Sequence, residues 1–316
     1  MDRVTLSDFV KNNNTDLGQS FEEFMVVIAK SAVTINAKLA RNGLIVEQGS
    51  SGDKNVYGED VQKLDEYANE VLTNALLLAK SVHAVGSEEL AQPKFSGHDG
   101  KYIITHDPLD GSSNIDTNLP IGTIFAVYPK NDTLLQRGST LIASGYVLYG
   151  PSLMLIYATA GTVNGFTFDP DSGNFILSHP NISIGDKKIY SVNEGYWEIF
   201  HDLDRNYISS IKKEGIYSLR YVGSMVGDVH RTLLKGGIFL YPSDAKHQNG
   251  KLRLLYEAAP LSFLIIQAGG AATSDGINPL DILPEKHDQR IPIVLGNKVE
   301  VDKYLNSTTK TNSDII

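Results

Sequence analysis

The stretch Thr105-His106-Asp107-Pro108-Leu109-Asp110-Gly111-Ser112-Ser113-Asn114-Ile115-Asp116 decides how the rest of the chain is interpreted. It follows an apolar run, residues 102–104, that predicts a buried strand. Two carboxylates stand where this strand ends, and hard oxygen ligands on a stiff turn suit Mg2+ or Mn2+. The amides and hydroxyls of the turn that follows suit a phosphate group. By itself, however, the stretch is more typical of an acidic surface turn, because Asp, Pro, Gly and Ser are common turn residues.

A second predicted strand, residues 82–85, also ends in paired acids, Glu88 and Glu89. In α/β sheets, sites form beyond the carboxyl ends of strands. We therefore expect the two strand ends to bring Glu88 and Glu89 together with Asp107 and Asp110 in one metal cluster. This expectation favours a functional site over a surface turn.

Two carboxylates elsewhere in the chain differ in their sequence surroundings, one polar and one apolar. Asp65 lies on a predicted helix over residues 60–80, and alone it is more typical of a solvated surface charge. Glu257 lies in an otherwise apolar stretch, residues 251–268, that predicts a helix. A carboxylate in such surroundings needs a partner such as a cation.

Composition limits the classes of function. The chain has 316 residues, 41% of them hydrophobic and 21% charged, as in ordinary globular proteins. The net charge is 28 − 37 = −9, which argues against binding nucleic acid through its phosphates. Cysteine is absent, which excludes disulfides and thiolate metal sites. The sequence contains no apolar run near 18 residues and no leader-like segment, so we expect no membrane association and a cytoplasmic location.

The elements predict a layered α/β (α+β) fold, with helices against a mixed sheet in each half. The first half, residues 1–185, has two predicted helices: residues 20–42, with Ser20 and Glu23 as a capping box and Gly43 as the stop, and residues 60–80. A Gly- and Ser-rich loop, residues 47–58, separates them. Strand patterns follow at residues 122–128, 141–149, 153–158, 163–168 and 174–177.

A polar stretch, residues 179–188, is the expected boundary before the second half, residues 186–316. Predicted strands at 189–192 and 238–241 alternate there with helices at 202–213 and 225–234, and residues 306–316 are expected to fray. We expect the active site to lie between the halves. The second half also carries basic and aromatic residues that suit phosphate binding, although scattered Lys and Arg are usually solvated. They are Tyr196, Arg220, Tyr221, Tyr241, Lys246, Lys251 and Arg253.

The stretch from Asp107 to Asp116 resembles the signature of class I fructose-1,6-bisphosphatases, and its looser form is shared by metal-dependent sugar and inositol phosphatases. The resemblance extends over nearly the whole chain, and second-half motifs narrow it to bisphosphatases of this type. The other matching motifs are Lys63-Leu64-Asp65, Ser87-Glu88-Glu89, Asn193-Glu194-Gly195-Tyr196, Arg220-Tyr221-Val222-Gly223-Ser224-Met225, Gly237-Ile238-Phe239-Leu240-Tyr241-Pro242 and Gly250-Lys251-Leu252-Arg253-Leu254-Leu255-Tyr256-Glu257.

This resemblance implies hydrolysis of the C1 phosphate of fructose 1,6-bisphosphate by a metal-activated water, without a covalent enzyme intermediate. Glu89 with Asp65 would activate the water. The resemblance also implies two or three Mg2+ (or Mn2+) ions, bound by Glu88, Asp107, Asp110, Glu257 and the carbonyl of Leu109. Of these ligands, Asp107 and Asp110 would also be catalytic.

The resemblance also assigns the substrate contacts and the assembly. The turn from Leu109 to Ser113 would hold the phosphoryl group that leaves, through Asp110, Gly111, Ser112 and Ser113. The other phosphate would be bound by Asn193, Tyr196, Arg220, Tyr221, Tyr241 and Lys251, and the sugar by Met225 and Lys246. In the implied homotetramer, a dimer of dimers, Arg220 would come from the neighbouring subunit.

The chain departs from the family pattern in two places. Glu59 stands where many relatives have a metal-binding Asp in the loop, and the resemblance implies that Glu59 also binds a metal. Relatives inhibited by AMP carry a Thr-Gly-Glu-Met/Leu-Thr motif where this chain has Gly18-Gln19-Ser20-Phe21-Glu22. Lys101 and Tyr102 match the nucleotide site, but Pro129 replaces an Arg. We therefore predict weak or absent inhibition by AMP.

Two alternatives remain at the level of the sequence. Sedoheptulose-1,7-bisphosphatase shares the metal core, and the weakened AMP site favours it. The intact residues Tyr196, Tyr241 and Lys251 favour the fructose substrate. A catalytically silent sugar-phosphate-binding regulator is the non-enzyme alternative, but such a protein would be expected to lack Glu89 or a metal carboxylate.

Overall fold

The computed structural model describes residues 3–14, 17–41 and 56–309, with the side chains of residues 56–62 and 308–309 left out. The predicted loop up to residue 55, the helix stop Gly43 and the last residues of the tail therefore lie outside the described residues. Among those that are described, no helix is long and apolar enough to cross a membrane.

The first half is built on an eight-stranded mixed sheet in the order β2-β1-β3-β4-β5-β6-β7-β8. Strand β1 runs parallel to β3, and every other neighbouring pair is antiparallel. The strands are β1 Val82–Ser87, β2 Lys94–Phe95, β3 Tyr102–Asp110, β4 Ile121–Pro129, β5 Ala143–Tyr149, β6 Leu153–Thr159, β7 Thr162–Asp169 and β8 Asn174–His179.

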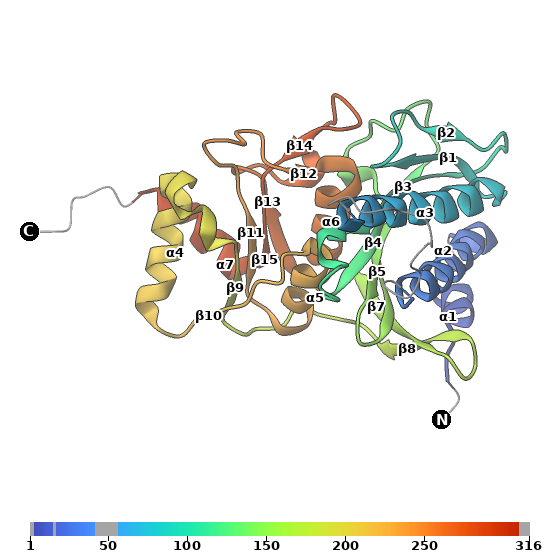
Figure 1. Cartoon of the computed structure of the whole chain (residues 1–316), viewed down its shortest axis with the longest axis horizontal. Coiled ribbons are helices and arrows are strands. Elements are labelled where there is room, and N and C mark those ends of the chain that lie inside the picture. The colour runs from blue at the N-terminus through green and yellow to red at the C-terminus, as the bar shows by residue number, and fades with distance from the viewer. Residues whose placement is uncertain (1–2, 15–16, 42–55, 310–316) are drawn as a thin grey trace, which may run out of the picture.

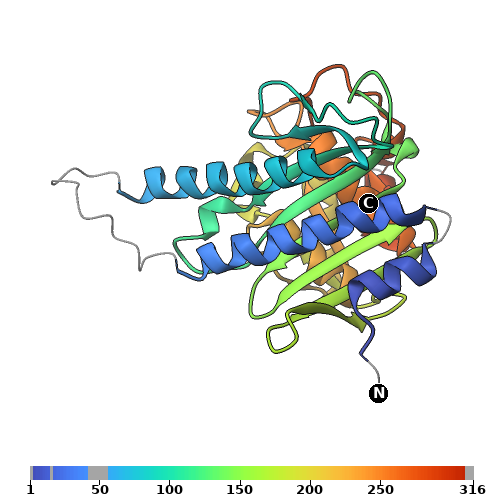
Figure 2. The same cartoon turned by 90° about the vertical axis from the view of Figure 1, so that its right-hand side faces the viewer.

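Three helices cover one face of this sheet: α1 Leu6–Asn13, α2 Gly18–Leu39 and α3 Val56–Leu78. Figure 2 shows α2 and α3 lying next to each other across the strands. The apolar stripe of α2 packs on the face of β4 that carries Phe125 and Val127, whereas Ile124 and Ala126 point into the core on the opposite face. This alternation follows from the two-residue period of a strand.

The second half contains a five-stranded sheet in the order β10-β9-β11-β15-β13 and a two-stranded ribbon of β12 and β14. The strands are β9 Ile189–Ser191, β10 Ser218–Leu219, β11 Ile238–Tyr241, β12 Leu252–Arg253, β13 Gly270–Thr273, β14 Arg290–Ile291 and β15 Ile293–Asn297. The helices are α4 Asp202–Glu214, α5 Met225–Lys235, α6 Ala259–Gln267 and α7 Lys298–Leu305. Short 3-10 turns are η1 Ser112–Asn114, η2 Gly138–Thr140, η3 Glu194–Ile199, η5 Pro279–Asp281 and η6 Asn306–Thr309, and η4 Leu254–Ala258 is a π-helix.

The two sheets share one layer of helices. Side chains of α5 and α6 belong to the same hydrophobic core as Ile124 and Tyr146 of the large sheet and Phe239 and Leu295 of the small one. Helices α4 and α7 pack on the outer face of the small sheet. Figure 1 shows the resulting succession of helix, sheet, helix, sheet and helix layers. The predicted layered α/β fold is confirmed.

Two local predictions in the first half are wrong. Helix α2 begins at Gly18, and Ser20 is not its N-cap, since Leu17 occupies that position without a side-chain bond. Glu23 is not part of a capping box, because its carboxylate accepts the backbone N–H groups of Lys80 and Ser81 at 3.1 and 2.9 Å. Helix α3 begins at Val56, inside the stretch predicted as a loop.

Candidate active site

The parallel pairing of β1 and β3 places two acidic strand ends next to each other. Ser87 pairs with His106, and the backbone N–H of Glu88 donates to the carbonyl of His106 at 3.1 Å. Glu88 and Asp107 therefore leave neighbouring strands at the same edge, as the sequence predicted. One carboxylate oxygen of Asp107 accepts the backbone N–H of Leu109 at 2.9 Å, and this bond fixes the orientation of the Asp107 side chain.

Glu257 joins these two carboxylates from the second half. The predicted helix does not begin at residue 251: β12 comes first, and the π-helix η4 then carries Glu257. Glu88, Asp107 and Glu257 each offer an oxygen, and these oxygens lie within 4.8 Å of one another. Asp107 and Glu257 are buried, and burial together with the neighbouring carboxylates raises the pKa of each well above its usual value.

The donor set of this cluster fits a divalent cation. Arg253 compensates part of its charge, since its Nε donates to Glu88 at 2.9 Å and its backbone N–H donates to Glu257 at 2.5 Å. The charge of Arg290 also acts on Glu88, but two guanidinium groups do not balance three carboxylates in a poorly solvated place, where unpaired charge is costly. Oxygen ligands at this spacing match hard ions such as Mg2+.

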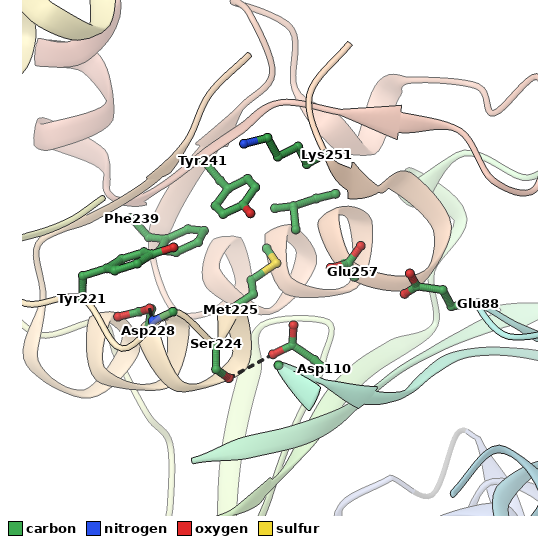
Figure 3. A pocket seen from close by; sticks show the side chains of 13 residues that line it. Glu88, Asp110, Tyr221, Ser224, Met225, Asp228, Phe239, Tyr241, Lys251 and Glu257 are labelled. Atoms are coloured by element: carbon green, nitrogen blue, oxygen red, sulfur yellow. Dashed lines mark hydrogen bonds between the residues drawn. The ribbon is translucent and has the colours of Figure 1, made fainter. Parts of the chain in front are cut away.

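Asp110 lies at the junction of the two halves. One of its oxygens accepts the N–H of Val226 at 2.7 Å and the hydroxyl of Ser224 at 3.2 Å, so the carboxylate meets the first turn of α5 (Figure 3). Burial raises the pKa of Asp110 to about 6, and these two hydrogen bonds limit the rise. Gly111 follows with φ +78°, and a Cβ there would lie 2.7 Å from the Cβ of Ser224. Only glycine allows this close approach.

Asp65 reaches the same region from α3, so its interpretation as a surface charge is wrong. Its carboxylate lies near Ser112, in the turn after β3. Burial, followed by the charge of Glu89, raises the pKa of Asp65 to about 7, although the Ser112 side chain works against the rise. The helical pattern around Asp65 gave no sign of this contact, because the contact depends on how α3 crosses the sheet.

A cavity of about 230 Å³ opens between the acidic cluster and the aromatic side chains of the second half (Figure 3). Predicted site residues that line it are Glu88, Asp110, Gly111, Tyr221, Met225, Tyr241, Lys251 and Glu257. The sequence did not single out the other lining residues, which are Gly223, Ser224, Asp228, Phe239 and Leu252. Four of these lie inside the quoted motifs, and Asp228 lies three residues after one, so the motifs themselves were the available signal.

Lys251 forms the cationic end of this cavity. Its Nζ lies 4.0 Å from the ring centre of Tyr196, 5.7 Å from that of Tyr241 and 3.2 Å from a carboxylate oxygen of Asp244. A shallow recess beside it is lined by Asn193 together with Tyr196, Tyr241 and Lys251. A charge-bearing ammonium held between aromatic rings is suited to a second anionic group of a ligand.

The remaining predicted residues lie apart from the cavity. Arg220 and Lys246 are exposed and line neither the cavity nor the recess. Ser113 is exposed, and Ser112 is half-buried at the turn. Glu59 lies within α3, but its side chain is outside the described residues.

Comparison with known proteins connects this geometry to one family. Residues 4–180 match the model of the N-terminal domain of fructose-1,6-bisphosphatase, and residues 184–309 match that of its C-terminal domain. A class 1 fructose-1,6-bisphosphatase of Sulfurihydrogenibium sp. is 49% identical over 90% of each chain. The cytosolic fructose-1,6-bisphosphatase of Solanum tuberosum is 44% identical over 96% of this chain and 94% of its own. The crystal structure of Leishmania major fructose-1,6-bisphosphatase in holo form is 38% identical, covers 98% of this chain and all of its own, and superposes with a TM-score of 0.90.

Proposed function

We infer that this chain, which belongs to the fructose-1,6-bisphosphatase family, hydrolyses fructose 1,6-bisphosphate to fructose 6-phosphate and inorganic phosphate. One observation carries this assignment: a carboxylate cluster and the cation of Lys251 face each other across a single cavity. With cations bound at the acidic end, a sugar with a phosphate at each end fits this arrangement. The relatives are named for the fructose substrate, so the seven-carbon alternative is not favoured.

We propose that the acidic end holds two or three Mg2+ ions. Glu88, Asp107, Asp110 and Glu257, with the carbonyl of Leu109, would bind them, and Glu59 would add a ligand from α3. When bound, such ions neutralise phosphate charge and increase the acidity of water. The cluster supports this proposal through its oxygen donors, its burial and the raised pKa of its carboxyls.

The chain's own residues would then perform the proton transfer. Glu89, supported by Asp65, accepts a proton from the water whose oxygen attacks the phosphorus. The bond from phosphorus to the C1 oxygen breaks, and that oxygen takes up a proton. A pKa of about 7 for Asp65 suits proton exchange near neutral pH. The turn from Gly111 to Ser113 would hold the phosphoryl group during the attack.

The opposite end of the cavity would keep the second phosphate in place. Lys251 lies between Tyr196 and Tyr241, and these three residues would bind the second phosphate together with Asn193 and Tyr221. Anchoring a remote phosphate reduces the orientational entropy lost at the reacting centre. Met225 lines the cavity between the two ends, where the sugar would lie, and Lys246 would have to approach it from its exposed position.

We also propose a cytoplasmic homotetramer in which Arg220 completes the site of a neighbouring subunit. The guanidinium of Arg220 donates to the neighbouring carbonyl of Leu219 at 2.8 Å, and its exposure leaves it accessible to a partner chain. The mass of the protein in solution and the activity of an Arg220→Ala variant would test this arrangement.

AMP is expected to inhibit weakly or not at all. The carboxylate of Glu22 accepts a hydrogen bond from Ser7 at 2.6 Å and lies 3.0 Å from the ammonium of Lys11. These contacts tie a negative charge and helix α1 to the first turns of α2, where an AMP phosphate would be expected. Titration of AMP during turnover tests this, and half-inhibition at low micromolar concentration would contradict it.

The primary test is phosphate release from fructose 1,6-bisphosphate and sedoheptulose 1,7-bisphosphate in the presence of Mg2+. We expect turnover with the fructose substrate, and a loss of more than roughly 100-fold in Asp110→Ala because a buried ligand is removed. Asp132→Ala, which changes an exposed carboxylate far from the cluster, is the matched control. Normal activity in Asp110→Ala would reject the metal assignment.

A further inference from the structure

Asp228 is a completely buried carboxylate in the first turn of α5, next to the cavity but outside the acidic cluster. One oxygen accepts the hydroxyl of Ser191 at 2.9 Å, the N–H of Val222 at 3.0 Å and Nη2 of Arg231 at 2.6 Å. The other oxygen accepts the N–H groups of Val222 and Gly223 at 3.1 and 3.0 Å. Such a set of donors holds an ionised carboxylate in one position.

These donors belong to the two segments that carry the proposed phosphate-binding residues. Ser191 ends β9, and Asn193 follows it two residues later. Val222 and Gly223 form the loop between β10 and α5, and this loop follows directly from Arg220 and Tyr221. Asp228 therefore joins both segments at a single carboxylate.

Arg231 strengthens the connection from the other side of the carboxylate. Its Nη2 donates to the carbonyl of Arg220 at 2.8 Å and to Ser191 at 2.9 Å, in addition to its bond with Asp228. The backbone on both sides of Tyr221 is thus fixed by one ion pair. Figure 3 shows Asp228 beside Tyr221, whose ring lines the cavity.

We propose that Asp228 is a positioning residue for the end of the substrate that keeps its phosphate. It acts by holding the loop of Arg220 and Tyr221 in register with the segment of Asn193 and Tyr196. None of its hydrogen bonds reaches the acidic cluster, and only its charge acts on Asp110, so its influence falls mainly on binding at the remote phosphate. This inference rests on the proposed function.

The Asp228→Asn variant tests it, because an amide keeps the shape but turns one acceptor into a donor that faces N–H groups. We expect KM for fructose 1,6-bisphosphate and the inhibition constant of fructose 6-phosphate to rise by roughly 10-fold or more, as for lost bonds to a charged group. The kcat value, and kcat/KM for fructose 1-phosphate, which lacks the remote phosphate, should change by less than about 3-fold.

Two comparisons make the test specific. Asp204→Asn, an equally buried carboxylate in the same half that contacts Tyr304 and not the cavity, should leave all these constants unchanged. In a double-mutant cycle, Asp228→Asn and Tyr221→Phe should be non-additive, because both act on the same loop. Thermal melting of each variant confirms that it is folded.

Equal losses with fructose 1,6-bisphosphate and fructose 1-phosphate would overturn the proposal, and so would additive effects or unchanged binding of fructose 6-phosphate. The proposed function is tested separately by the unmodified protein. If that protein releases no phosphate, the function fails, whereas the affinity for fructose 6-phosphate measured by calorimetry still decides the role of Asp228.

Discussion

The carboxylates of Glu88, Asp107 and Glu257 place three negative charges in a small, largely buried volume. Such an arrangement is unfavourable without cations, because desolvation and mutual repulsion act in the same direction. The raised pKa of Asp107 and of Glu257 expresses this cost. Each carboxylate is therefore retained at some expense to the stability of the metal-free chain.

Glu257→Gln removes one charge and one strong ligand from this cluster. We expect the affinity for Mn2+, measured by calorimetry, to fall by roughly 10- to 100-fold, and activity to require correspondingly more Mg2+. The melting temperature in chelator should not fall, because a repelled charge has been removed. Glu66→Gln, at an exposed position on α3, is the control. Unchanged Mn2+ affinity in Glu257→Gln would show that this residue is not a ligand.

Sequence patterns predicted most elements because period and turn chemistry are local. Asp107 and Glu88 were expected at neighbouring strand ends, and the parallel pairing of β1 with β3 accounts for their meeting. The π-helix that presents Glu257 was not predictable, because a five-residue π turn has the same apolar composition as an α-helix. π turns are uncommon and occur often at functional sites.

Features that depend on contacts between distant elements escaped the sequence analysis. Glu23 matched a capping box, but the free amides before β1 bind its carboxylate instead. The helical pattern alone predicted a surface charge at Asp65, and only the family resemblance assigned it to the site; the crossing of α3 over the sheet brings it near Ser112. Asp228 looked like an ordinary first-turn acid of α5, since its role depends on β9 and on the loop after β10.

The contact between α4 and α7 contains a buried carboxylate that can be tested at the level of these elements. Asp204 of α4 accepts the hydroxyl of Tyr304 of α7 at 2.7 Å. Burial raises the pKa of Asp204 to about 6, although this hydrogen bond works against the rise. A raised pKa means that the folded state favours the protonated form, so the carboxyl stabilises the protein less as the pH increases.

Asp204→Asn should remove this dependence. We expect its unfolding free energy, relative to that of the unmodified protein, to increase by roughly 1 kcal/mol between about pH 5 and pH 8. Urea unfolding of both proteins in chelator measures the difference. Both proteins have the same active-site carboxyls, so the pH dependence that these groups cause cancels in the comparison. If the difference in unfolding free energy between the two proteins does not change with pH, the pKa of Asp204 in the folded state is not raised above its unfolded value.

At the scale of the whole molecule, the site exists only where the two halves meet. The acidic strand ends come from the large sheet, whereas Glu257, Lys251 and the first turn of α5 come from the second half. The helices α5 and α6 lie between both sheets and share one core with them. Cations bound at this junction would therefore stabilise the contact between the halves as well as the substrate.

This coupling predicts how stability depends on pH and metal. Without metal, the pKa values of Asp65, about 7, and Asp110, about 6, exceed those of unfolded carboxyls, and those of Asp107 and Glu257 are also raised. The folded state then binds more protons than the unfolded state, and stability falls as pH rises through these values. His106 and His230 have lowered pKa values and act in the opposite direction, but only below the unfolded value of about 6.5.

The melting temperature in chelator should accordingly fall between about pH 6.5 and pH 8, by roughly 4 °C or more if 1 kcal/mol corresponds to about 2 °C in a chain of this size. Saturating Mg2+ favours the ionised carboxylates, so the stabilisation by metal should grow over the same interval. Scanning calorimetry with and without Mg2+ measures both effects, and Glu257→Gln should weaken both. If Mg2+ increases the melting temperature equally at about pH 6.5 and at about pH 8, the carboxyls with raised pKa values are not the groups that bind it.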